Sequence, residues 1–194
     1  MVRPWLLAGY ECWIVDLQHP AGEHREGNLV RVGADLRTWL PPRREYAVAF
    51  AFPPCTNLAV SGARWFREKG LAGLAEGLAL VERSALICEW TEAPWMLENP
   101  VSVLSSYWRK PDHTFHPWEY ADANDAENYT KKTCLWTGGG FVMPERRPAM
   151  APHRNDIWLM PPSEDRGDLR SATPLGFAEA VWGANDPQRR LAVA

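Results

Sequence analysis

One short segment limits the fold more than any other. Residues 46–52 form an uninterrupted apolar run, YAVAFAF, and Pro53 and Pro54 end it. A strand with one solvent-exposed face alternates apolar and polar residues, whereas a continuous apolar run indicates burial on both faces. Strands of that kind occur mainly in parallel sheets that helices cover on both sides. The segment therefore predicts an α/β fold with a mostly parallel, twisted sheet flanked by helices.

The following residues extend this strand into a strand–helix–strand unit. Apolar residues recur at spacings of three and four across residues 71–92, with Glu and Arg on the other side, which predicts a long amphipathic helix. Residues 95–97 predict a second buried strand, which runs into Glu98-Asn99. Such crossovers are right-handed, and ligands of such sheets bind beyond the carboxyl ends of the strands. We therefore expect Pro54-Cys55 and Glu98-Asn99 to emerge side by side.

Two side chains at these strand ends are candidates for catalysis, one as a nucleophile and one as a proton donor. Cysteine is the most nucleophilic common side chain near neutral pH, and a rigid strand end would hold Cys55 at a fixed angle. The apolar run before Glu98 predicts partial burial, which favours the protonated, proton-donating form of a carboxyl group. Taken singly, Cys55 also fits a buried structural thiol and Glu98 a surface acid that caps a loop. As a pair, they suit addition of a thiol to an electron-poor ring that needs protonation.

Local signals predict shorter elements on both sides of this unit. Gly9 is a suitable stop for a first helix, and Thr173-Pro174 is typical of a helix start. A polar stretch with Pro20, Gly22 and Gly27 predicts a loop, and most of residues 100–130 are also expected to be loop. The expected helices are residues 4–9, one turn at 35–40 and 174–184; the expected strands are 11–17, 29–32, an edge near 113–120, and 133–136.

Composition sets wider limits on the protein. The 194 residues suit one domain with a substantial core, and no apolar run approaches the length of about 18 residues that spans a bilayer. The first residues lack a signal-peptide pattern. A net charge of −3 with scattered Lys and Arg does not show the clustered positive charge that is typical of nucleic-acid-binding proteins. Four separated cysteines without a CxxC pair predict reduced thiols, and His113 and His116 alone do not predict a metal site.

Four segments in chain order resemble cytosine-5 DNA methyltransferases, and in particular a small methylase-like subfamily common in phages and prophages. The segments are FPPCTNLAVSGARWF (52–66), ENPVSVLSSYWRKPD (98–112), YTKKTCLWTGG (129–139) and DRGDLRSATPLGFAEAV (165–181). The resemblance implies a Rossmann-like, S-adenosylmethionine-dependent methyltransferase domain over residues 1–194. It further implies methyl transfer to carbon 5 of cytosine in DNA, in the cytoplasm of a bacterium or a phage-infected host cell.

The resemblance assigns roles at the strand ends. Cys55 would attack carbon 6 of the pyrimidine. Glu98 would hydrogen-bond ring nitrogen 3 and the exocyclic amine, which stabilises the enamine that attacks the methyl donor. Pro54 and Asn99 would hold these two residues in position.

Further residues are matched to the cofactor and to the nucleic acid. Asp16 corresponds to the acid that binds the ribose hydroxyls of S-adenosylmethionine and Asp35 to the acid beside its adenine, although both also fit ordinary loop and N-cap carboxylates. Lys131 and Lys132 lie where the family places a basic motif near the target base, with a solvated lysine pair as the alternative. Other candidates are Ser61 and Arg64, in a loop that closes on substrate, and the cleft or core tryptophans Trp65, Trp108 and Trp136.

The sequence departs from the family pattern at two places. The family begins with a strand and a Gly-containing turn that cradle the methionine end of the cofactor, whereas residues 5–17 match the helix and second strand that should follow. Three explanations for the absent central strand are open. Residues 157–160 (IWLM) or a partner in an oligomer would take its place, or the start site is placed too late. The second departure is a short recognition region, about residues 138–172.

These departures leave three functions open. The first is methylation of cytosine in DNA through a covalent cysteine adduct. The second is C5 modification of a pyrimidine mononucleotide, which would explain the short recognition region and the acidic charge. The third is a degenerate methylase that binds a nucleotide or DNA.

Overall fold

The computed structural model describes residues 1–121, 126–147 and 170–189. The chain divides into two compact units. The larger unit comprises Trp5–Thr114 and Thr133–Phe141, and the smaller unit Met1–Pro4, Phe115–Lys132 and Val142–Ala194. Within the described ranges, no helix has the length and apolar character needed to cross a bilayer.

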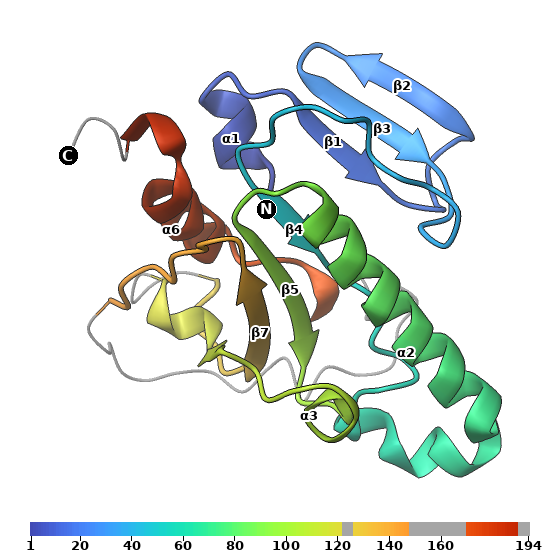
Figure 1. The fold of residues 1–194 in the computed structure, drawn as a ribbon. Coiled ribbons are helices and arrows are strands. Elements are labelled where there is room, and N and C mark those ends of the chain that lie inside the picture. Colours follow the sequence, from blue (N-terminus) through green and yellow to red (C-terminus); the bar gives the residue numbers. More distant parts are fainter. Residues whose placement is uncertain (122–125, 148–169, 190–194) are drawn as a thin grey trace. The chain divides into compact units, whose positions relative to one another are not determined.

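Two mixed sheets organise the larger unit (Figure 1). The N-terminal sheet has the order β1-β3-β2, with β1 (Cys12–Val15), β3 (Leu29–Gly33) and β2 (Gly22–Glu26). The central sheet has the order β4-β5-β7-β6, with β4 (Ala49–Ala51), β5 (Trp95–Pro100), β7 (Thr133–Gly138) and β6 (His113–Phe115). The helical segments of the same part of the chain are α1 (Arg3–Leu7), η1 (Val60–Trp65), α2 (Phe66–Trp90) and α3 (Leu104–Tyr107).

The predicted strand–helix–strand unit is present. Strands β4 and β5 pair in parallel, with Ala51 opposite Leu97, and α2 connects them. Strand β4 is shorter than the predicted segment 46–52, and its three residues are half-buried rather than buried. Helix α2 starts before the predicted residue 71, because a kink at Gly70 (φ 64°) joins an additional turn to it.

The expectation of a mostly parallel sheet is wrong, because each sheet contains an antiparallel pair. Strand β7 begins at Thr133, opposite Pro100 where β5 ends, so the chain re-enters at that end of the sheet and runs back along β5. In the N-terminal sheet, only the two residues Gly27-Asn28 separate β2 from β3, and so short a connection permits only antiparallel pairing. The fold is therefore mixed α/β, in which β1·β3 and β4·β5 pair in parallel and β2·β3 and β5·β7 pair antiparallel.

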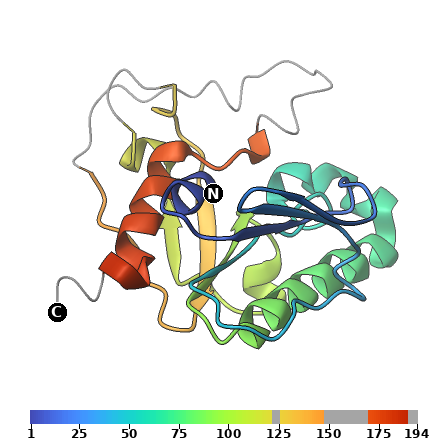
Figure 2. The ribbon, with the colours of Figure 1, turned by 90° about the horizontal axis from the view of Figure 1, so that it is seen from above.

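Helix α2 covers one face of the central sheet (Figures 1 and 2). Its apolar side packs on alternate residues of β5 and β7, and Leu58 and Leu104 complete the cluster. The buried members of this core are Leu58, Val81, Ala85, Cys88, Trp95, Leu97, Leu104, Cys134 and Trp136. This packing holds the carboxyl ends of β4 and β5 against a rigid layer.

Strands β1 and β4 are end strands of their sheets. Among the described residues, no strand pairs with the outer edge of β4, where the expected first strand of the fold would lie. The ring of Trp5 from α1 lies 6.0 Å from the ring of Phe50 in β4. Residues 157–160, the sequence candidate for that place, lie outside the described residues.

The smaller unit has an aromatic core. Phe177 of α6 (Leu175–Asn185) stacks on Phe115 at 3.9 Å, and Tyr120, after η2 (Pro117–Glu119), packs edge-on against it at 5.1 Å. The predicted C-terminal helix is confirmed, but Thr173 does not cap it. The carboxylate of Glu127 accepts hydrogen bonds from the first backbone N–H groups of α6 instead.

Candidate functional site

Three hydrogen bonds join the chain segments that leave β4 and β5. The Asn99 side-chain amide donates to the Pro53 carbonyl at 3.2 Å. Further on, the backbone N–H of Val60 donates to Val101 at 3.0 Å, and that of Val103 donates to Leu58 at 3.1 Å. The segments after the two strands therefore run side by side, as the sequence predicts for Pro54-Cys55 and Glu98-Asn99.

Cys55 opens a tight turn between these bonds. Its carbonyl accepts hydrogen bonds from the N–H groups of Leu58 and Ala59 at 2.9 and 2.8 Å. Leu58 is fully buried, and a Cβ on Gly77 of α2 would lie 2.9 Å from its side chain. Because residue 77 is a glycine, α2 approaches closely enough to anchor the turn. Sequence reasoning missed both anchors, since a glycine in a helix and a leucine in a loop carry no distinct signal.

The four cysteines differ in their surroundings. Cys12, Cys88 and Cys134 are buried, whereas Cys55 is half-exposed. Burial raises the pKa of Cys12 from 9.0 to about 11 and that of Cys88 from 9.0 to about 12, so both remain protonated near neutral pH. A nucleophilic thiol must ionise and must be reachable by its substrate. Cys55 is the cysteine of this chain whose exposure suits that task.

Glu98 lies within β5, opposite Leu135 of β7. Side chains alternate along a strand, so Glu98 projects from the face opposite to Leu97 and Asn99, away from the α2 layer. Glu98 is half-buried, and its Oε1 atom is shielded from solvent. A carboxyl group in such surroundings is suited to exchange a proton with a substrate nitrogen.

Asn99 follows Glu98 in β5 and is buried, with 1% of its surface exposed. Its amide nitrogen holds the Pro53 carbonyl, while its Oδ1 has no hydrogen-bond partner among the described residues. The bond holds the backbone two residues before Cys55, and the positioning role of Asn99 stays a prediction. Pro54 itself is exposed and directs the chain from this bond to the thiol.

The predicted substrate loop forms the 3₁₀ segment η1. Ser61 and Arg64 are exposed there, and the Arg64 guanidinium lies 5.0 Å from the centre of the exposed Trp65 ring. Lys131 and Lys132 belong to the smaller unit, where the Lys131 ammonium donates to the Arg170 carbonyl at 2.6 Å. The structure thus places η1 next to Cys55 in the chain, but it does not bring the two lysines into the same unit.

The three candidate tryptophans have different surroundings. Trp136 is 1% exposed and belongs to the core, with its indole N–H donating to the Arg109 carbonyl at 2.8 Å. Trp108 is partly exposed and stacks on Trp136 at 5.9 Å. Trp65 is 48% and Trp108 40% exposed, so both present ring surface to solvent and Trp136 does not.

The two acids matched to a cofactor differ as well. Asp16 is exposed just after β1, and its Oδ1 accepts a hydrogen bond from the Gln18 N–H at 2.8 Å, so it retains lone pairs for a ribose diol. Both oxygens of Asp35 are held by the Arg37 guanidinium at 2.8–3.0 Å, which lowers the pKa of Asp35. Asp16 therefore keeps carboxylate lone pairs for a ligand, whereas both oxygens of Asp35 are engaged by Arg37; the cofactor roles of both stay predictions.

Comparisons with models of protein families, with curated proteins and with solved structures found no match. No group of three or more His, Cys, Asp or Glu side chains among the described residues is arranged to hold a metal ion. The arrangement of Cys55, Glu98 and Asn99 at adjacent strand ends is therefore the feature from which a function can be argued.

Proposed function

We propose that the protein is a pyrimidine C5 methyltransferase-like enzyme that acts on cytosine in DNA through a covalent adduct at Cys55. The observation that carries the proposal is the Asn99–Pro53 hydrogen bond of 3.2 Å, which ties the segment carrying Cys55 to the strand carrying Glu98. The half-exposure of Cys55, beside three buried cysteines, supports its role as nucleophile. S-adenosylmethionine is the proposed methyl donor, and no step below depends on it.

The chain's own residues supply the activation half of the chemistry. The Cys55 thiolate forms an Sγ–C6 bond, the C5=C6 electron pair moves to form C4=C5, and the C4=N3 pair takes a proton at N3 from Glu98. The resulting enamine is nucleophilic at C5. In water, C5 takes a solvent proton and loses its original one, Glu98 recovers its proton from N3, and the thiolate leaves as C5=C6 forms again. The net result is hydrogen exchange at C5 without any methyl donor.

Release of tritium from [5-³H]cytosine tests this proposal. We expect release from one or more of three substrates, namely single-stranded DNA, duplex DNA and dCMP. Cys55→Ala should reduce release to background, and Glu98→Gln should reduce it about 10²-fold because a positioned proton donor is lost. Cys12→Ala is the matched control: it removes a buried thiol from β1 and should leave release unchanged. Circular dichroism checks that each variant folds.

The same assay separates the alternatives. Release from dCMP but not from DNA favours the mononucleotide enzyme, which the net charge of −3 also favours. Release that S-adenosylmethionine does not convert into C5 methylation marks a methylase without donor binding. Absence of release from all three substrates, or full release by Cys55→Ala, contradicts the proposal.

A further inference from the structure

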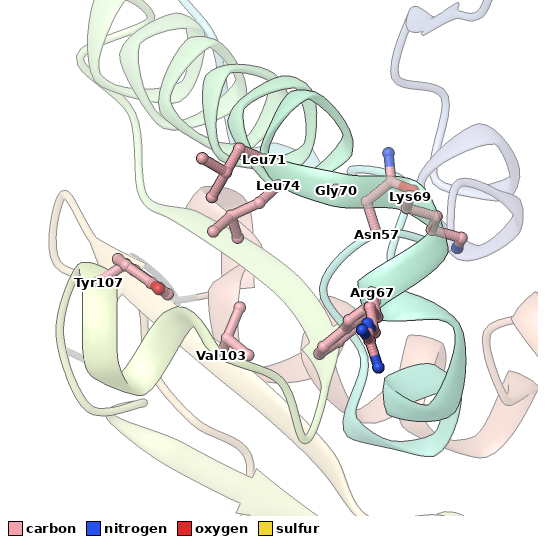
Figure 3. A pocket seen from close by; sticks show the side chains of 9 residues that line it. Asn57, Arg67, Lys69, Gly70, Leu71, Leu74, Val103 and Tyr107 are labelled. Carbon is pink, nitrogen blue, oxygen red and sulfur yellow. The ribbon is translucent and has the colours of Figure 1, made fainter.

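A cavity of about 370 Å³ lies beside the segment that follows Cys55 (Figure 3). Leu71 and Leu74 of α2 line it on one side, and Val103 and Tyr107 of the α3 segment line it on the other. Asn57, two residues after Cys55, contributes to the wall. The volume is within the range of about 300–1,000 Å³ that is usual for small-ligand sites.

The kink in α2 creates this cavity. Gly70 has φ 64° and ψ −167°, so the helix breaks and the turn with Phe66 and Arg67 leaves the axis of the rest of α2. The Lys69 ammonium fixes that turn by donating to the Thr56 carbonyl. The break leaves apolar surface open: Leu71 is 84% exposed and Tyr107 is 60% exposed. Burying such surface against a ligand would be favourable.

The charge around the cavity opposes that of the whole chain. Residues 64–69 contain the cations Arg64, Arg67 and Lys69 and the acid Glu68, while the chain as a whole has a net charge of −3. Arg67 lines the cavity, and no ion pair involves it in the part of the chain that the structure describes. Arg67 is therefore available to pair with an anionic group of a ligand in the cavity.

We propose that this cavity binds one unpaired nucleotide of single-stranded DNA. Its base would lie on the apolar side chains with Tyr107 as the stacking ring, and its phosphate would pair with Arg67. Aromatic rings combined with cations are the usual surface for single strands, because every base has a face that stacks, and an arginine fork matches a phosphate. The inference rests on the proposed function for the identity of the polymer: the strand that enters here leads along residues 55–66 to Cys55.

Fluorescence anisotropy with a 5′-labelled oligo(dC) strand, at two salt concentrations, tests the inference. Tyr107→Ala should weaken binding about tenfold through lost stacking. Arg67→Ala should weaken it at low salt and lower the salt slope by about 0.7, the value for one phosphate contact of a single strand. Both side chains are exposed, so both variants should fold. Arg31→Ala is the control: Arg31 is a half-buried cation on β3 that pairs with Glu26 and does not line the cavity, and its variant should bind as the unchanged protein does.

The outcomes distinguish this inference from the proposed function. The inference is overturned if both cavity variants bind like Arg31→Ala, if the unchanged protein binds no single strand, or if an acidic peptide competes better than unlabelled oligo(dC). Tritium release from dCMP with no strand binding leaves the proposed function standing without this inference. Strand binding that depends on Arg67 and Tyr107, in a protein that releases no tritium, leaves the inference standing without the proposed function.

Discussion

The central and N-terminal sheets are built from the same chain in different ways. In the central sheet, consecutive residues of β5 and β7 are buried, and Met96, Leu97 and Leu135 have no exposed surface. In the N-terminal sheet, every residue of β2 is exposed, and burial alternates along β3 so that only Val30 and Val32 are covered. The central sheet is stabilised by packing on both faces, and the N-terminal sheet by strand pairing and one apolar face.

The candidate site residues are divided between these two sheets. Glu98 and Asn99 lie in β5 of the central sheet, and the Asn99–Pro53 bond joins the segment of Cys55 to it, so a sheet with buried surface on both faces holds all three. Asp16 follows β1 of the N-terminal sheet, where local opening costs less because less apolar surface is lost. The residues proposed to act on the base thus lie on or next to the sheet with the larger core, and the acid matched to a cofactor follows a strand of the sheet that opens at lower cost.

The largest expected effect comes from removing core volume from the central sheet. Leu97→Ala should lower the free energy of unfolding by about 3 kcal/mol, because it leaves a cavity beside α2. Ile14→Ala on the half-buried β1 should lower it by about 1 kcal/mol, since less apolar area is lost. Urea unfolding followed by circular dichroism measures both, with Leu7→Ala as the exposed control. Equal losses for Leu97→Ala and Ile14→Ala would contradict the proposed difference between the sheets.

The second prediction concerns the bond that joins the candidate site to the central sheet. Asn99→Ala should lower the free energy of unfolding by about 1–2 kcal/mol, because the Pro53 carbonyl loses its donor. It should reduce tritium release more than this loss explains, since the turn at Cys55 is no longer fixed. Ser84→Ala is the matched control: it removes a buried hydroxyl that has no partner among the described residues. Release that is unchanged in a folded Asn99→Ala variant would show that the bond has no positioning role.

The central strand–helix–strand unit could be predicted from sequence because burial leaves a direct pattern there. The apolar runs at 46–52 and 95–97 predicted the two strands and the spacing of apolar residues predicted α2, although β4 is shorter and less buried than its run suggested. The direction of β7 had no such signal. It depends on the end at which the chain re-enters the sheet, which is opposite Pro100 where β5 ends. Strand β2 was missed because its exposed sequence GEHRE has no apolar alternation, although the Gly-Asn pair before β3 is a hairpin signal.

The site was predictable in its side chains and not in its backbone. Cys55, Glu98 and Asn99 are recognisable as residues that carry chemistry or fix a turn. The bonds from Val60 to Val101 and from Val103 to Leu58 join main-chain groups, which are the same at every residue and leave no trace in sequence. The pairing of Asp35 with Arg37 is local, and the close spacing of the two residues was the signal that could have predicted it.

The smallest expected effect is an acid-induced loosening confined to the N-terminal sheet. Hydrogen bonds from Arg25, Trp13 and Arg44 lower the pKa of Glu11 from 4.5 to about 2. Between these pH values the unfolded chain takes up a proton that the folded chain does not. The contribution of Glu11 to the free energy of unfolding is therefore fully present above pH 4.5 and is lost as the pH falls towards 2. The effect is small because exposed ion pairs are screened by solvent.

Amide hydrogen exchange at pH 5 and pH 3 measures this effect. Exchange in β1 and β2 should accelerate at the lower pH, after correction for intrinsic rates, while β5 and β7 remain protected. Glu11→Gln should remove the difference between the two pH values, because the residue no longer titrates, and Glu82→Gln on the exposed side of α2 should not. Equal acceleration in β5 would mean that the sheets open together, and that the acid joining β1 to Arg25 of β2 does not set the stability of the N-terminal sheet.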